Sequence, residues 1–165
     1  MDTLNNDWDL DKFDPAAASA RVRLFHLCAL RNKLNEGDAA PTNQWALSLE
    51  TSLHSCITFN LVPSHSSDGL RGKVEVTSLN ERYARKTLRV FSFEPIGEVQ
   101  VERVMELMQR KNFTFSHERE GGRHWLSEIM GDLEAASCIP QGGAMVAREA
   151  LSKYWEDPEG PELII

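Results

Sequence analysis

Two short segments of this chain hold polar residues at spacings that suit chemistry on a bound small molecule. Gln44 is the first residue of an alternating apolar run, and His54 follows about one hairpin later in the sequence. A hairpin would place both residues on neighbouring strands. A glutamine amide cannot take up a proton near neutral pH, but it donates and accepts hydrogen bonds, whereas a histidine can act as an acid or base. Gln44 could therefore orient a carbonyl group, and His54 could give acid or base help.

The second segment is a glycine pair, Gly121-Gly122, directly before an amphipathic helical pattern that begins at Arg123. Free backbone N–H groups and the positive end of a helix dipole stabilise negative charge. A glycine pair is equally suited to a turn with positive φ, and both interpretations stay open. We expect Gly121, Gly122 and Arg123 to contact a substrate together with Trp45, although a tryptophan in such a strand is more often a core residue.

The cysteines and histidines do not form a metal-binding pattern. Cys28, Cys56 and Cys138 are widely spaced, without a C-x-x-C pair, which suits reduced thiols in the cytoplasm. The five histidines show neither zinc-ligand spacing nor an H-E-x-x-H motif. We therefore expect no metal and no cofactor.

The hydrophobic periodicity predicts strands first and helices later. Residues 1–20, rich in Asp and Ala, are expected to form a flexible leader, and residues 21–165 a single domain. Alternating apolar positions predict five strands, at 22–30, 44–50, 54–62, 73–79 and 86–94. Spacing of three and four predicts helices at 98–111, 123–136 and 145–155, and Phe113–Phe115 suits a short edge strand. This order is typical of an α+β domain with an antiparallel sheet packed on helices.

Composition and net charge limit the classes of partner that the chain can bind. The chain has 165 residues and a net charge of -7, which disfavours nucleic acid and anionic membrane surfaces. No apolar run approaches the roughly 20 residues that span a bilayer, and the acidic N-terminus is unlike a signal peptide. We expect a cytoplasmic protein whose partner is a small molecule; the sequence does not indicate an oligomeric state.

Both polar segments resemble the active-site segments of the lecithin:retinol acyltransferase-like proteins, relatives of the NlpC-type cysteine peptidases. In that family a strand reading His-Trp-Ala-Ile-Tyr-Val carries the base, and a later helix opening Asn-Cys-Glu-His-Phe carries the nucleophile. Here Gln44-Trp45-Ala46-Leu47 and Gly122-Arg123-His124-Trp125 occupy those frames. The segments also resemble a set of small filamentous-fungal proteins that read Asn-His-Trp and Gly-Cys-Arg-Tyr-Trp. Gln44 and Gly122 then replace the base and the nucleophile, and His54 lies near the place of a second histidine of the family. The resemblance implies that Gln44 and His54 are the catalytic residues and share one cleft, between strand 44–50 and helix 123–136.

The resemblance implies a permuted papain-like fold that has lost its thiol chemistry. The first function that it implies is a cofactor-independent cyclisation or isomerisation of a small molecule in fungal specialised metabolism. Such a reaction relies on proximity and hydrogen bonding. One alternative is a catalytically inactive interaction module. Another is a thiol hydrolase or acyltransferase that uses Cys28 or Cys56 instead.

Overall fold

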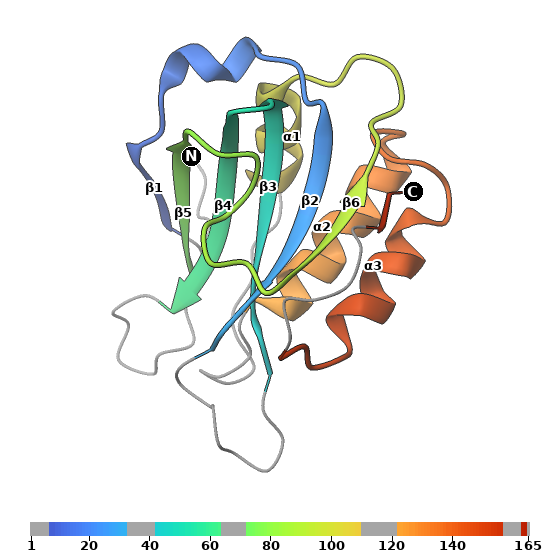
Figure 1. The fold of residues 1–165 in the computed structure, drawn as a ribbon. Helices are drawn as coiled ribbons and strands as arrows, with labels where there is room; N and C mark the ends of the chain where they lie inside the picture. The colour runs from blue at the N-terminus through green and yellow to red at the C-terminus, as the bar shows by residue number, and fades with distance from the viewer. Residues whose placement is uncertain (1–6, 33–41, 64–71, 110–121, 157–162, 165) are drawn as a thin grey trace.

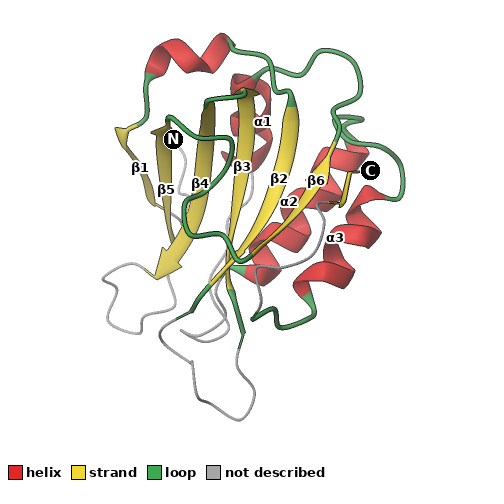
Figure 2. Cartoon of the chain, viewed as in Figure 1, coloured by secondary structure: helices red, strands yellow, loops and turns green. Residues whose placement is uncertain are grey.

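The computed structural model describes residues 7–32, 42–63, 72–109, 122–156 and 163–164, and in these the chain forms one seven-stranded sheet with three α-helices behind it (Figures 1 and 2). The strands lie in the order β1-β5-β4-β3-β2-β6-β7. The elements are β1 (Asp7–Lys12), the 3-10 helix η1 (Pro15–Ser19), β2 (Leu24–Leu30), β3 (Gln44–Ser52), β4 (Ser55–Pro63), β5 (Gly72–Leu79), β6 (Arg89–Phe93), α1 (Val101–Gln109), α2 (Arg123–Ala135), α3 (Gly143–Leu151) and β7 (Leu163–Ile164).

The α+β class expected from the sequence is confirmed. The five central strands pair antiparallel and match the five expected strands, and the three helices follow them. The two outer strands, β1 and β7, were not expected, and each pairs parallel with its neighbour. The expected edge strand Phe113–Phe115 lies outside the described residues.

The expected flexible leader differs from the structure over residues 7–20. Strand β1 pairs with β5, and η1 follows it, begun by Asp14, whose carboxylate accepts a hydrogen bond from the Ala16 N–H. Trp8 lies edge-on to Phe59, with ring centroids 6.1 Å apart, and Phe13 packs on the main core. Burial of these aromatic groups offsets the entropy lost in ordering an otherwise polar segment.

The two faces of the sheet have different coverings. Alternate residues of each strand, such as Leu27, Trp45 and Phe59, point to the helices and build the main core. The opposite face carries smaller and more polar side chains, among them His26, Ser48 and Glu50. The segment 80–88, between β5 and β6, crosses that second face in front of the sheet (Figure 1). We call residues 80–88 the strap.

None of the described helices is both long and apolar enough to cross a bilayer.

Candidate functional site

Gln44 and Gly122 meet at one backbone oxygen. The side-chain Nε2 of Gln44, at the start of β3, donates to the Leu61 carbonyl over 3.0 Å. Gly122 lies at the start of α2, and a Cβ built on it would lie 3.4 Å from that same carbonyl oxygen. The two positions singled out in the sequence, 78 residues apart, therefore reach the same carbonyl group. Gln44 approaches it from the strap side of the sheet and Gly122 from the helix side.

Asn60 completes this arrangement and was not expected from the sequence. Its Oδ1 accepts a second hydrogen bond from Gln44 Nε2, over 2.8 Å, so both amide hydrogens of Gln44 are used. Asn60 pairs with Ala46 across the hairpin, which places its side chain diagonally opposite Gln44 on the same face. The available signal was a lone amide inside the apolar β4 run, combined with the hairpin register.

Gly122 is a glycine because of its backbone. Its φ of 78° is left-handed, which L side chains rarely adopt, and its carbonyl begins α2 by accepting a hydrogen bond from the Leu126 N–H. Its neighbours leave ordinary van der Waals distance for a Cβ, so the backbone conformation rather than crowding disfavours a side chain. Its partner in the doublet, Gly121, lies outside the described residues.

His54 does not join Gln44. It lies exposed in the tight turn between Ser52 and Ser55, where β3 ends, while Gln44 is at the beginning of that strand. The expectation that the two side chains share one cleft is wrong, because the hairpin turn falls at His54 itself. The whole length of β3 separates them.

Trp45 is a core residue in the structure. Its side chain is fully buried between the sheet and α2, together with Trp125. Both side chains belong to the main core between the sheet and the helices, where a cleft was expected. Neither indole N–H has a hydrogen-bond acceptor among the described residues, which is uncommon for a buried donor.

The cysteine thiols are buried and held in the protonated form. Burial raises the pKa of the Cys28 thiol to about 11, and it also raises the pKa of Cys56 and of Cys138. The thiolate is the nucleophilic form, so these three thiols are poor nucleophiles at neutral pH. The described residues contain no group of three His, Cys, Asp or Glu side chains arranged around a metal ion.

A second polar cluster lies on the strap side of the sheet, and sequence analysis missed it. His26 contacts Ser92 Oγ through Nδ1 and Glu50 Oε1 through Nε2, both over 2.7 Å. An ionised carboxylate only accepts hydrogen bonds, so the hydrogen-bond network assigns a hydrogen to Nε2 of His26. All three residues are fully buried, and three separate strands supply them.

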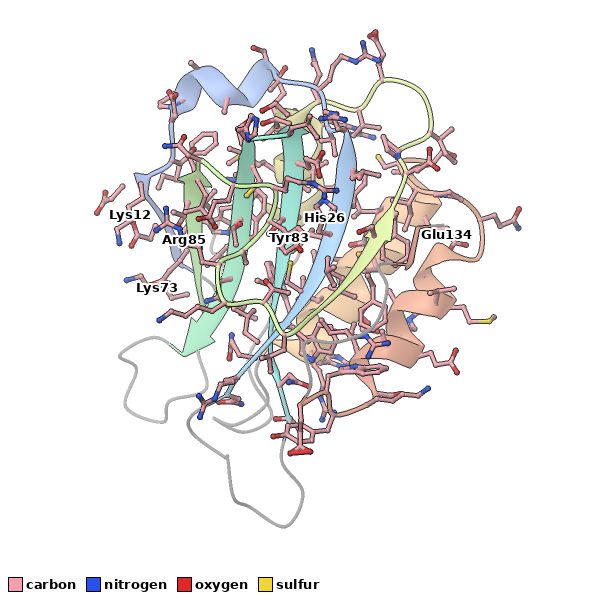
Figure 3. The ribbon with its side chains drawn as sticks, viewed as in Figure 1. Lys12, His26, Lys73, Tyr83, Arg85 and Glu134 are labelled. Atoms are coloured by element: carbon pink, nitrogen blue, oxygen red, sulfur yellow. The ribbon has the colours of Figure 1, made fainter. Side chains whose placement is uncertain are left out.

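This cluster anchors the strap. Arg82 Nε donates to Glu50 Oε1 over 3.1 Å, and the Ala84 N–H donates to Ser48 Oγ over 3.0 Å. Tyr83 packs edge-on to His26 with centroids 5.1 Å apart, and Figure 3 shows the two side by side. Serine hydrolases use a serine, a histidine and a carboxylate in mutual contact, but here the strap separates these side chains from solvent.

Arg123 lines a hollow on the outer flank of α2. The hollow has a volume of about 260 Å³ and lies between α2 and α3. Gln44 does not line it; its walls are Arg123, His124, Ser127, Arg148, Leu151 and Ser152. Arg148 also borders a neighbouring hollow of about 500 Å³, near the end of α2. The expected contact residue Arg123 therefore belongs to a different surface from Gln44.

Residues 25–164 match the model of a protein family described as a domain of unknown function (DUF7770). The chain belongs to this family. The match begins at the second residue of β2 and includes Gln44, Gly122 and both hollows, whereas β1 and η1 precede it. No curated protein and no solved structure matches the chain.

Proposed function

We propose that this DUF7770 domain descends from permuted papain-like thiol enzymes and works by binding a small molecule without forming a thiol intermediate. The observation that carries the proposal is the meeting of Gln44 and Gly122 at the Leu61 carbonyl. A thiol enzyme needs its nucleophile and base in hydrogen-bond reach, with a third group orienting the base. Position 122 would be the nucleophile, 44 the base and Asn60 the orienting group.

The residue types at those positions argue for binding. Gly122 has no side chain to attack a substrate, and the Gln44 amide cannot accept a proton. Both of its amide hydrogens are already bonded within the sheet. The three cysteines are buried and their pKa values are raised, which argues against a substitute nucleophile; as free thiols they also favour the cytoplasm.

Hydrolysis of p-nitrophenyl acetate tests the loss of thiol catalysis. A thiolate would attack the ester carbonyl, take the acyl group and release p-nitrophenolate, and water would then free the enzyme. We expect the native protein to give no burst of p-nitrophenolate, with or without prior treatment with iodoacetamide. A burst that iodoacetamide abolishes would overturn the proposal, and the variants Cys28→Ala and Cys56→Ala would then identify the thiol.

A second candidate is the cofactor-independent cyclisation or isomerisation of a specialised metabolite. It is favoured by the Gln44 carbonyl oxygen, which accepts no hydrogen bond from the described residues and belongs to a half-buried, firmly oriented amide. Such reactions conserve mass. Purified protein added to a cell extract of its source organism would change the retention time of a compound without changing its mass, and Gln44→Leu would abolish the change.

A further inference from the structure

The hollow between α2 and α3 concentrates positive charge in an acidic protein. Two arginines from different helices, Arg123 and Arg148, line its volume of about 260 Å³ together with the hydroxyl groups of Ser127 and Ser152. The whole chain has a net charge of -7. A local cationic surface of this kind raises the concentration of anions around it, even where the net charge is negative.

Arg148 is held in place by its neighbours. Its Nε donates to Ser127 Oγ over 3.2 Å, which joins α3 to α2. On α2, Gly131 leaves room for the guanidinium, since a Cβ on that glycine would lie 2.9 Å from Arg148 Nη2. A guanidinium that is already positioned loses less entropy when it binds an anion.

Arg123 adds charge where the helix dipole already disfavours it. It occupies the first turn of α2, which contains no acidic residue. Its half-buried side chain forms no ion pair with any residue that the structure describes. A cation at the positive end of a helix and beside a second cation is destabilising, and a bound anion would reverse that effect.

From this arrangement we infer that the hollow binds the phosphate group of a phosphate monoester. Gln44 is not among the walls of the hollow, so this inference goes beyond the proposed function. Two guanidinium groups match the double negative charge, and their planar forks suit bidentate contact with phosphate oxygens. The volume suits a head group rather than a whole drug-sized molecule.

The neighbouring hollow would take the rest of the ligand. It has a volume of about 500 Å³, shares Arg148, and includes the apolar side chains of Ile96 and Ile139. Glu134 also lines it, and its Oε1 accepts a hydrogen bond from the Ala144 N–H at the start of α3 (Figure 3 labels Glu134). This carboxylate disfavours a second anionic group, so the organic part of the ligand carries no negative charge.

Calorimetric titration of the whole protein with phenyl phosphate tests the site, in Tris chloride at constant ionic strength. We expect saturable one-site binding, weaker binding of inorganic phosphate, and no binding of acetate. Arg123→Gln and Arg148→Gln should each weaken binding about tenfold or more, because each removes charge-assisted hydrogen bonds. Arg103→Gln is the control, since Arg103 lies on α1 and pairs with Glu106.

Arg123→Gln removes no hydrogen bond of the described structure, so a loss of binding in that variant cannot be attributed to misfolding if its melting temperature is unchanged. Absence of saturable phenyl phosphate binding at millimolar concentration would overturn the inference. So would equal weakening by Arg103→Gln, or acetate binding as tight as phosphate. These results leave the loss of thiol catalysis intact, because p-nitrophenyl acetate tests that claim separately.

Discussion

Glu50 Oε1 accepts from both His26 Nε2, over 2.7 Å, and Arg82 Nε, over 3.1 Å, so one buried carboxylate joins the sheet to the strap. Its other oxygen faces Arg23 Nη1 at 3.4 Å without a well-directed hydrogen bond. A carboxylate deprived of water in this way needs its cationic and N–H partners. The strap therefore depends on the charge of Glu50.

The variant Glu50→Gln should lower the free energy of unfolding by about 2–4 kcal/mol, because it weakens charge-assisted hydrogen bonds inside the protein. Urea unfolding measures the loss. Hydrogen exchange of the Ala84 N–H, which bonds to Ser48 Oγ, should also become faster as the strap loosens.

The control for that variant is Glu81→Gln. Glu81 pairs with Arg85 at the surface, over 3.1 Å, and such a pair contributes below about 1 kcal/mol. Equal destabilisation by the two variants would show that the buried carboxylate does not anchor the strap.

Asn43 ties the segment that follows α3 to the start of β3. Its Nδ2 donates to the Trp155 carbonyl over 2.8 Å, and its Oδ1 accepts from the Trp155 N–H over 2.8 Å. We expect Asn43→Ala to cost about 2–4 kcal/mol, since the backbone groups of Trp155 lose both partners. Unfolding followed by fluorescence measures this; a cost equal to that of Asn80→Ala, an exposed control, would contradict the role.

The buried thiol of Cys28 predicts a loss of stability at alkaline pH. Its pKa is about 11 in the folded protein against 9.0 when unperturbed, so the unfolded state releases its proton first. The contribution is fully present below pH 9 and is lost as the pH rises towards 11, by at most about 3 kcal/mol. Urea unfolding at several pH values should show a smaller alkaline loss for Cys28→Ala; identical pH profiles would contradict the prediction.

The variant Gly131→Ala changes the position of Arg148 in the hollow without changing the charge of the hollow. Alanine raises helix stability by roughly 0.8–1 kcal/mol. Its Cβ would lie 2.9 Å from Arg148 Nη2, so the guanidinium must move, and we expect little net change in stability. Phenyl phosphate binding should nevertheless weaken, although both arginines remain. Unchanged affinity in Gly131→Ala would show that the position of Arg148 is unimportant.

The sequence predicted the layers of the fold better than the contents of its sites. Alternation and helical spacing find Trp45 and Trp125 because burial imposes a period on the chain. Strand β1 escaped prediction since its pairing with β5 is long-range and its residues are mostly charged.

The polar clusters were harder to predict for a similar reason. His26, Glu50 and Ser92 are separated in sequence and meet only through strand register, which no local pattern encodes. Gln44 and Gly122 were found because a resemblance supplied the pairing that periodicity cannot. The same resemblance misplaced His54, whose position was fixed by the hairpin turn.

The most direct test of a vanished thiol–imidazole site is to restore it. Iodoacetamide labelling at position 122 should be compared between Gly122→Cys and the double variant Gln44→His, Gly122→Cys over a range of pH. Met145→Cys, an exposed site on α3, provides the control thiol with and without Gln44→His. An imidazole beside the helix start lowers the pKa of a thiol. We predict that Gln44→His accelerates labelling at 122 below neutral pH and leaves the control unchanged. Equal labelling rates in the single and double variants would contradict the descent of this site from a thiol enzyme.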